Sequence, residues 1–441
     1  MKITVRGTLR DNLAFIRHLK RRDRIFRKTP ANTMNQGPMN LLAEQLHPRR
    51  QVLRIVDIRR ETPTSKTYQL EPADGRHAPA DSLREPADGR HAPAGDPQAP
   101  PSDPKRPAFF RAGQYIAVED MVEGVPVSRP YSISSTPDEA ADNGFYEITI
   151  KAGEDGFFAP WALREWKTGR ILHCSAPAGT FYFEPLRDAV DIVCIAGGSG
   201  ITPFKSILTD TLRYYPDPRF TLIYGVDGVP EIMFRKELEE LRATYPDRLS
   251  VVTVFSGPGR NADAFPDVDW ETEEGFITAG LIRKYIAGLD DVSYFICGPP
   301  AMYSFLDGEL REFSLKPGRL RKENYGRSLA GPGGGRNYTI TVLKSRAGVK
   351  TEISEPMLIS ADETETVLTA LERAGLNPPS LCRSGECAWC RSRLVEGDIF
   401  IPPENDGRRQ ADKKFGWFHP CSSYPRSDLV IEVPENPMQW R

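Results

Sequence analysis

Short segments rich in Tyr, Ile and Val alternate with Gly and Pro turns between residues 51 and 187. They include "KTYQL", "AGQYIAV", "RPYSISS" and "FYEITIKAG". Segments of this length and composition predict β-strands, and closely spaced turns join neighbouring strands antiparallel to one another. We therefore predict an antiparallel β-barrel at 51–187.

After residue 188 apolar strands alternate with segments whose apolar residues recur at helical spacing. In chain order they are "DIVCIAGG", "TPFKSILTDTLRYY", "FTLIYGV", "MFRKELEELRATY", "LSVVTVFS" and "VSYFICGPP". Strands and helices in alternation favour a parallel sheet with helices on both faces, the doubly wound α/β architecture. We predict such a domain at 188–327.

Two stretches of biased composition divide the rest of the chain. "EPADGRHAPA" occurs at 71–80 and again at 85–94, and the region 71–107 lacks periodic apolar residues. We expect it to be a disordered insertion in the barrel, because it buries too little surface to offset its ordering entropy. The Gly-rich segment 328–336 is predicted to be a flexible linker. A third domain then occupies 337–441.

The first 50 residues form a basic arm in the sequence. Residues 1–28 hold ten Lys or Arg against Asp11 and Asp23, although the whole chain has a net charge of -2. Leu9, Leu13, Ile16 and Leu19 recur at roughly helical spacing among the basic residues. This pattern fits docking to an acidic partner or to an anionic membrane surface, and equally a solvated tail. Residues 32–48 are predicted to form a short helix.

The location of the chain is suggested by two further features. No apolar run approaches the ~20 residues that cross a bilayer, so no membrane span is expected, and the arm lacks the apolar core of an export signal. Four of the seven cysteines cluster toward the C-terminus, unlike a disulfide framework. We expect a cytoplasmic protein and no nucleic-acid partner.

The cysteines carry the sharpest chemical signal. Cys382, Cys387 and Cys390 are followed by Cys421, the C-x4-C-x2-C...C spacing that supplies four thiolates to a 2Fe-2S cluster. Zinc is the alternative, but its ligands usually come in closely spaced pairs. Residues 337–441 resemble a plant-type ferredoxin domain, an α+β fold of the β-grasp kind. The resemblance implies that all four cysteines bind iron. Ala388 stands where relatives often have Gly.

A glycine turn begins the α/β domain. In "IAGGSGITPF", at 195–204, we expect Thr202 to act as N-cap and Pro203 as the first helical residue. The free backbone N–H groups at this helix start would then face a pyrophosphate. The alternative is a glycine turn needed only for tight packing.

Two further motifs flank this turn, "RPYSIS" at 129–134 and "CGPPAM" at 297–302. With these motifs, residues 51–327 resemble the flavin barrel and nicotinamide domain of the ferredoxin-NADP reductase-like superfamily. The resemblance implies that Arg129 pairs with a flavin phosphate, Tyr131 lies against the isoalloxazine ring, and Ser132 hydrogen-bonds near flavin N5. It further implies that hydride passes to the flavin beside Cys297 and Gly298. The remaining implied cofactor contacts are Pro130, Gly197, Gly198, Gly200, Thr202 and Pro299.

The identity of both cofactors depends on single positions. Relatives that bind FAD commonly have Ser or Thr three residues after a glycine near the adenine-side phosphate, whereas this chain has "GFFA" from Gly156. Backbone N–H groups still serve there, so FAD is favoured and FMN is the alternative. Asp227, after the second strand of the α/β domain, would accept hydrogen bonds from ribose hydroxyls and repel a 2'-phosphate. NADH is therefore the expected cosubstrate.

Together these features predict a fused reductase that passes electrons from NADH through a flavin to the cluster and on to a partner redox protein or oxygenase. It resembles the reductase components of oxygenase systems. The alternative is an NADH-responsive redox sensor, or a docking subunit of a larger electron-transfer complex. Arg383, Arg391 and Arg393 around the cysteine loop are expected either to steer an acidic partner or to be ordinary solvated charge. "ENYG" at 323–326 resembles the end of the reductase module, and this resemblance implies that Tyr325 lies near the flavin. The acceptor protein and the oligomeric state are left open.

Overall fold

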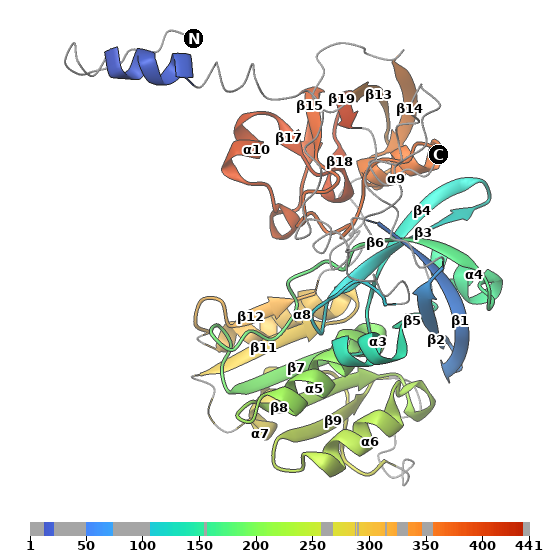
Figure 1. Cartoon of the computed structure of the whole chain (residues 1–441), viewed down its shortest axis with the longest axis vertical. Helices are drawn as coiled ribbons and strands as arrows, with labels where there is room; N and C mark the ends of the chain where they lie inside the picture. Colours follow the sequence, from blue (N-terminus) through green and yellow to red (C-terminus); the bar gives the residue numbers. More distant parts are fainter. Residues whose placement is uncertain are drawn as a thin grey trace.

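The structure of the 441-residue chain is a computed structural model. It describes residues 13–21, 50–73, 106–153, 157–256, 268–286, 288, 291–313, 315–323, 334–345 and 356–434. These residues build three large sheets and one two-stranded sheet. The three large sheets each have a buried apolar core and belong to three successive units along the chain (Figure 1).

Six antiparallel strands form the first sheet, in the order β4-β3-β6-β1-β2-β5. Ile133, just after β4, forms an antiparallel bridge to Ile148 in β5, so the two edges of the sheet meet and close it into a barrel. The predicted antiparallel barrel is confirmed. The strands are β1 (Arg50–Thr62), β2 (Ser65–Pro72), β3 (Tyr115–Val122), β4 (Val125–Ser132), β5 (Tyr146–Lys151) and β6 (Ile171–Ser175).

The insertion begins later than we expected. Strand β2 continues to Pro72, which pairs with Leu53 of β1. The prediction of disorder from residue 71 was therefore wrong for its first residues, because the β1–β2 ladder extends over them. Residues 74–105, which contain the rest of the first copy of the duplicated segment and all of the second, lie outside the described residues.

Six parallel strands form the second sheet, in the order β10-β9-β8-β7-β11-β12. The order reverses between β7 and β11, and ligands of doubly wound sheets bind at the carboxyl ends of the strands at such a point. Gly197 ends β7 and Cys297 ends β11, so both candidate motifs meet there. The strands are β7 (Asp191–Gly197), β8 (Arg219–Val226), β9 (Leu249–Phe255), β10 (Glu271–Glu274), β11 (Val292–Cys297) and β12 (Leu320–Lys322).

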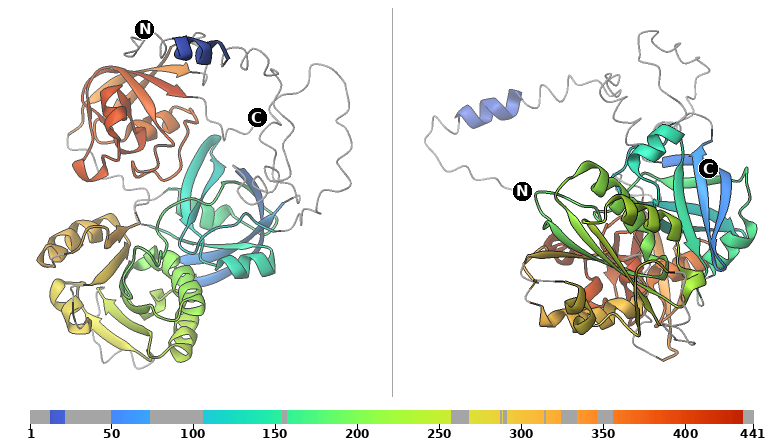
Figure 2. Two further views of the ribbon diagram at one scale, coloured as in Figure 1. Left: turned by 60° about the vertical axis from the view of Figure 1, so that its left-hand side comes forward. Right: turned by 90° about the horizontal axis from the view of Figure 1, so that it is seen from below.

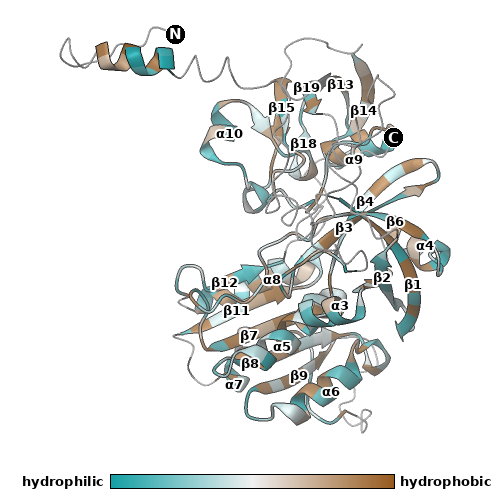
Figure 3. Ribbon diagram, in the orientation of Figure 1, coloured by the Kyte–Doolittle hydropathy of each residue, from teal (hydrophilic) through white to brown (hydrophobic). Residues whose placement is uncertain are grey.

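Helices cover both faces of this sheet, as the alternating pattern predicted. Helices α5 (Thr202–Tyr214) and α6 (Arg235–Thr244) pack on one face, with α7 (Ala279–Tyr285) and α8 (Pro300–Glu309) on the other. Apolar strands fill the centre while the polar sides of the helices face outward (Figure 3). The barrel carries the shorter helices α3 (Pro137–Asn143) and α4 (Phe158–Glu165).

The third unit is α+β, as predicted. A mixed sheet runs in the order β14-β13-β19-β15-β17, with β13 and β19 parallel and the other pairs antiparallel. Helix α9 (Val367–Arg373) packs into its core, and Thr366 caps that helix by accepting from the Thr369 N–H. The remaining elements are β13 (Asn337–Ser345), β14 (Met357–Asp362), β15 (Ser392–Glu396), β16 (Ile399–Phe400), α10 (Gln410–Lys414), β17 (Trp417–Phe418), β18 (Tyr424–Pro425) and β19 (Leu429–Pro434).

Part of the basic arm is described. Residues 13–21 form a helix on which Leu13, Ile16 and Leu19 are exposed. The predicted helix at 32–48 lies outside the described residues, as do most of the 328–336 linker and Tyr325. Within the described ranges, no helix is long and apolar enough to cross a membrane.

Helix α9 of the third unit packs against β4 of the barrel, the strand that carries the "RPYS" motif. Figure 1 and the left view of Figure 2 show the third unit above this part of the barrel and the α/β unit below it. The cysteine loop, the flavin motif and the glycine turn, far apart in the sequence, are thereby brought into one region.

Candidate electron-transfer site

The four predicted ligand cysteines converge at the end of the third unit. Cys390 Sγ lies 3.4 Å from Cys421 Sγ, and Cys382 hydrogen-bonds with the thiols of Cys387 and Cys421. Cys382, Cys390 and Cys421 are buried, whereas Cys387 is exposed. Three thiols from one loop and one from a distant segment therefore meet as the spacing predicted.

Backbone N–H groups of the loop point at these sulfurs. Gly385 N–H donates to Cys421 Sγ at 3.2 Å. The N–H groups of Ser384 and Cys387 donate to Cys382 Sγ, and that of Trp389 donates to Cys387 Sγ, each at 3.4 Å. Donors of this kind stabilise negative charge on thiolates, so the loop is built for sulfurs in their anionic form.

Left-handed backbone conformations aim these N–H groups. Gly385 has φ 85°, and Arg383 and Ala388 both have φ 58°. A Cβ on Gly385 would lie 2.4 Å from the Asn405 carbonyl oxygen. Both this close contact and the left-handed φ therefore require glycine at position 385. Ala388 carries a steric cost that glycine avoids.

Replacing Ala388 by Gly should therefore stabilise the intact protein by about 1 kcal/mol, because glycine adopts a left-handed φ without strain. The unfolding midpoint of the cluster-loaded protein measures the effect. Ala411→Gly is the matched control, since Ala411 is exposed in the helix α10. It should lose about 1 kcal/mol. Equal destabilisation by both substitutions would contradict the assigned strain.

The donor set fits a 2Fe-2S cluster, in which two irons each take two thiolates. Hydrogen bonds with Cys387 and Cys421 lower the pKa of Cys382 well below its usual value, and the bond to Cys382 raises the pKa of Cys387 and of Cys421. Among the residues that the structure describes, no group of three or more His, Cys, Asp or Glu is spaced for a single metal ion. Three thiols from one loop and one from a distant segment match the four-thiolate ligand set of such a cluster.

The flavin motif lies on β4 and just beyond it. Arg129 is half-buried, and its guanidinium lies over the rings of Phe157 and Phe158 at 5.2 and 5.9 Å from their centres. Tyr131 stacks on Phe158 with 6.4 Å between the ring centres, and Pro130 is buried. Burial raises the pKa of the Tyr131 hydroxyl, which therefore stays neutral.

Ser132 lies opposite Tyr115 in the β3–β4 ladder. Ser134, two residues further on, has a buried hydroxyl with no hydrogen-bond partner among the described residues. An orphaned polar atom beside the predicted flavin contacts is what a site for a polar cofactor provides. The motif residues therefore fit a flavin, although Gly156, the predicted adenine-side glycine, lies outside the described residues.

The glycine turn touches the end of β11. A Cβ on Gly200 would lie 2.0 Å from the carbonyl oxygen of Cys297, and one on Gly197 would lie 2.7 Å from Met302 Sδ. Tight packing alone therefore requires glycine at these two positions. Gly198 differs, since it has φ 51° and a Cβ placed there would meet only Lys151 Nζ, at 3.8 Å. Gly198 is the position where a diphosphate has room.

The expectation that Thr202 caps helix α5 was wrong. Residues Gly198–Ile201 form a turn of 3-10 helix that runs directly into α5, so the N-cap position falls on Ile201. The Thr202 hydroxyl instead donates to the Ser199 carbonyl at 2.6 Å. Pro203 is the second residue of the helix, not its first.

Cys297 is buried at the end of β11, and burial raises the pKa of its thiol well above the usual value. The next residue, Gly298, donates its N–H to the Tyr303 hydroxyl at 3.1 Å, which itself donates to the Glu323 carbonyl. Pro299 is exposed and starts α8 as its N-cap. A neutral thiol beside this glycine turn offers a polarisable, uncharged wall for a nicotinamide ring.

Asp227 is exposed immediately after β8, the strand next to β7. The carboxyl ends of parallel strands meet at one edge of a sheet, so Asp227 lies on the same edge as the glycine turn. This placement is the one its predicted ribose contact needs.

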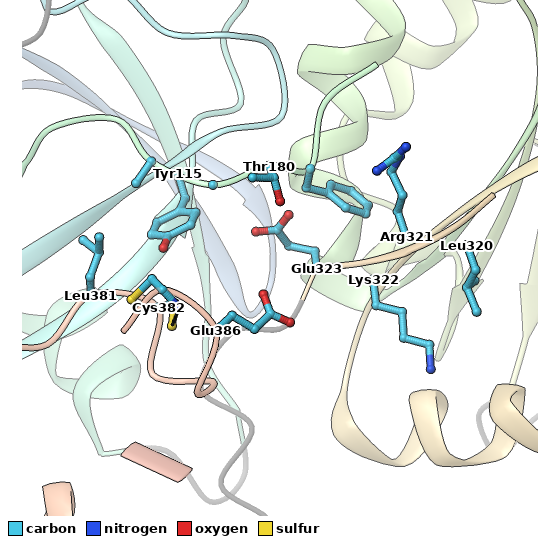
Figure 4. A pocket seen from close by; sticks show the side chains of 13 residues that line it. Tyr115, Thr180, Leu320, Arg321, Lys322, Glu323, Leu381, Cys382 and Glu386 are labelled. Atoms are coloured by element: carbon cyan, nitrogen blue, oxygen red, sulfur yellow. Dashed lines mark hydrogen bonds between the residues drawn. The ribbon is translucent and has the colours of Figure 1, made fainter. Parts of the chain in front are cut away.

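A cavity of about 360 Å³ joins the three units. The barrel contributes Tyr115 and Gly179, the α/β unit contributes Glu323, and the cysteine loop contributes Cys382 and Cys387. In Figure 4, Tyr115 points to Cys382, while Glu323 and Glu386 reach into the space between the units. Sequence reasoning missed Tyr115, Glu323 and Glu386, because only the packing of the three units brings them together.

The three arginines around the loop differ in exposure. Arg383 is buried against Glu372, so it is not available to steer a partner, and that part of the expectation was wrong. Arg391 pairs with Asp412 at 3.1 Å. Arg393 lies 3.6 Å from Glu432, and half of its side chain is exposed.

Glu119 of β3 lies in the interface between the barrel and the third unit and accepts a hydrogen bond from Asn377. Burial raises its pKa to about 7, with repulsion from Glu372 adding to the shift and Arg50 opposing it. An acid with a raised pKa stabilises the folded form below its ordinary pKa of 4.5 and loses that contribution as pH rises through 7.

The wild-type protein should therefore lose up to about 3 kcal/mol of stability relative to Glu119→Gln as pH rises from about 5 to about 8. Unfolding midpoints of the two proteins across this range measure the difference. The neighbouring His173, opposite Glu119 in the ladder, is unchanged in both proteins, so its titration cancels. Parallel pH profiles for both proteins would contradict the assignment.

Comparisons with known proteins agree with this arrangement. The model of the oxidoreductase FAD-binding domain matches residues 103–183, that of the oxidoreductase NAD-binding domain matches 194–307, and that of the 2Fe-2S iron-sulfur cluster binding domain matches 351–426. The three domains follow one another in the predicted order.

Curated relatives include components of an epoxidase and of monooxygenases. One subunit of the 1,2-phenylacetyl-CoA epoxidase of Escherichia coli K12 is 28% identical over 73% of this chain and 88% of its own. The ferredoxin reductase component of the 3-ketosteroid-9-alpha-monooxygenase of Mycobacterium tuberculosis (strain CDC 1551 / Oshkosh) is 28% identical over 74% and 86%. The solved phthalate dioxygenase reductase aligns with a TM-score of 0.53 and 17% identity over 87% of this chain and 98% of that one.

The three matched ranges cover the flavin motif, the glycine turn and the cysteine loop. The chain is an oxidoreductase with FAD-binding, NAD-binding and 2Fe-2S domains. It carries these three domains in that order, and it is similar to reductase components of oxygenase systems.

Proposed function

We propose that this chain takes electrons from NADH through FAD to its 2Fe-2S cluster and passes them to an oxygenase component. The observation that carries the proposal is the shared cavity, where the cluster ligands Cys382 and Cys387 face Tyr115 of the barrel and Glu323 of the α/β unit. Electron transfer from the flavin to the cluster requires that the cluster ligands lie close to the flavin contacts. The shared cavity brings the three units together in this way.

A bound flavin accepts two electrons as a hydride and releases them singly, which links NADH to a one-electron cluster. The chain's own residues hold the reactants in place. Gly200 allows the glycine turn to contact the backbone of Cys297, so the nicotinamide and diphosphate contacts lie on adjoining strand ends. The neutral Cys297 thiol limits water at this wall without adding a charge.

Ser132 is proposed to donate to flavin N5, where hydride arrives. Its strand partner Tyr115 lines the cavity beside Cys382, so the Ser132 position and the cluster loop lie on either side of one tyrosine. Burial is the main cause that raises the pKa of Tyr115 well above its usual value, and negative charge on Cys382 adds to it. Tyr115 is buried and therefore stays protonated.

The cysteine loop would hold the cluster through Cys382, Cys387, Cys390 and Cys421. The N–H donors at Gly385 and Trp389 would raise its reduction potential by stabilising negative charge on sulfur. Electrons are proposed to leave near Trp389, which is exposed and does not line the cavity. Because the cluster domain is part of the same chain, its effective concentration at the flavin is high.

The acceptor is proposed from the relatives, which are parts of an epoxidase and of monooxygenases. All seven cysteines are free of disulfides, in keeping with a reducing compartment such as the cytoplasm. The exposed apolar residues of the 13–21 helix remain a candidate docking element for the arm.

Steady-state turnover with NADH tests this function. Ferricyanide takes electrons from flavin and cytochrome c takes them from the cluster, so the intact protein should reduce both for many turnovers. An NADH-responsive sensor needs no sustained turnover. A single equivalent of reduction followed by arrest would favour that second function instead.

A further inference from the structure

Two guanidinium groups share one carboxylate where the ferredoxin domain meets the barrel. Arg383 makes a bidentate ion pair with Glu372, with N···O distances of 2.5 and 2.9 Å. Both residues belong to the ferredoxin domain, one in the cysteine loop and one in α9. Arg129 of the barrel approaches the same carboxylate, with Nη1 3.9 Å from Glu372 Oε2.

The two arginines also converge on one backbone group. Arg129 Nη1 donates to the Ser128 carbonyl at 2.8 Å, and Arg383 Nη1 lies 3.4 Å from the same oxygen. Only 9% of the Arg383 side chain, 11% of that of Glu372 and 23% of that of Arg129 are exposed. The cluster of three charges therefore has an excess positive charge in a largely dry place.

Excess positive charge in such a place favours binding of an anion. Burial, with repulsion from Arg383 next, lowers the pKa of Arg129 to about 10, while Glu372 opposes the shift. A phosphate at Arg129 would neutralise the excess charge. Among the described residues, Glu372 is the only carboxylate that forms an ion pair with Arg129, and it competes for the same guanidinium.

We propose that Arg383 is a positioning residue that holds the Glu372 carboxylate away from Arg129, so that Arg129 is free to bind the flavin phosphate. This inference rests on the proposed assignment of Arg129. A buried carboxylate requires a cation. Without Arg383, Glu372 would pair with Arg129 directly and the phosphate would have to displace it.

Arg383 and Glu372 both arrive with the ferredoxin domain, so this domain brings the competing carboxylate to Arg129 together with the cation that holds it. The residue next to the ligand Cys382 would thus set how strongly Arg129 binds the flavin phosphate when the two domains are docked.

The dissociation constant of FAD, measured by fluorescence on protein stripped of flavin but still carrying its cluster, tests the proposal. Arg383→Gln should weaken FAD binding by about tenfold, the usual size of a coupling between sites. Glu372→Gln should leave it unchanged or tighten it. The double variant Arg383→Gln with Glu372→Gln should return to within about twofold of wild type, since no carboxylate is left to compete.

Weaker FAD binding in Arg383→Gln but not in Glu372→Gln separates competition from loss of docking. If Arg383 only held the domains together, both single variants would weaken FAD binding to a similar extent. The double variant would then bind FAD no more tightly than either of them. That result overturns the proposal. Arg383→Lys, which keeps the charge and loses the bidentate geometry, should fall between wild type and Arg383→Gln. It serves as the second variant if iron content shows that Arg383→Gln loses the cluster.

Two further variants complete the design. Arg393→Gln removes a cation of the same domain that faces Glu432, and it should leave FAD affinity unchanged. Arg129→Gln tests the underlying assignment. If Arg129→Gln does not weaken FAD binding, the phosphate assignment fails; if it does while Arg383→Gln has no effect, only the inference about Arg383 fails.

Discussion

Cys421→Ser should remove the cluster and, with it, electron transfer to cytochrome c, while NADH-driven reduction of ferricyanide continues. Cys421 is buried, lies 3.4 Å from Cys390 Sγ and accepts the Gly385 N–H, so it completes the ligand set from outside the loop. Loss of the tethered cluster should lower cytochrome c reduction by about 100-fold or more, the advantage that tethering supplies. Iron content and the two activities measure the effect.

Cys174→Ala is the control for this result. Cys174 is as buried as Cys421 but lies in the barrel strand β6, and it should keep its iron and both activities. If Cys421→Ser lost ferricyanide reduction to the same extent as cytochrome c reduction, electrons would not divide at the flavin, and the proposed order of transfer would be wrong.

Asp227→Ser should shift the nicotinamide preference. The wild-type protein should prefer NADH, because the exposed Asp227 after β8 repels the 2'-phosphate of NADPH. Removing this charge should raise kcat/KM for NADPH by about 10- to 100-fold, the range of a like-charge contact at a binding site. The value for NADH should fall modestly, since a ribose hydrogen bond is lost.

Asp217→Ser is a matched control for this second result. Asp217 is an exposed aspartate at the opposite end of the same strand, just before β8 begins at Arg219. It changes the net charge equally and should leave both kcat/KM values unchanged. A wild-type preference for NADPH, or an equal response to both substitutions, would contradict the ribose assignment.

The parts of the site that could be predicted are those encoded in short segments. The cysteine spacing placed four thiols correctly because three of them lie in one loop, whose left-handed residues Arg383 and Gly385 turn N–H groups toward sulfur. The glycine turn and Cys297 could be placed together because carboxyl ends of neighbouring parallel strands share an edge. Local pattern and sheet topology were sufficient there.

The rest depended on packing between the units. Arg383 looked like a surface cation, and only the position of α9 against β4 shows that Glu372 buries it. Tyr115, Glu323 and Glu386 come from three distant segments, so no pattern in the sequence groups them. The prediction that Thr202 caps α5 was wrong because a capping pattern in the sequence does not reveal the 3-10 turn that precedes the helix.

An anaerobic titration of the purified protein with NADH tests the central claim most directly. The visible spectrum follows the flavin, and electron paramagnetic resonance follows the cluster. We predict bleaching of the flavin bands together with the signal of one reduced 2Fe-2S centre at stoichiometric NADH. If NADH reduced neither centre although dithionite reduced both, the proposed transfer from NADH to the cluster would be contradicted.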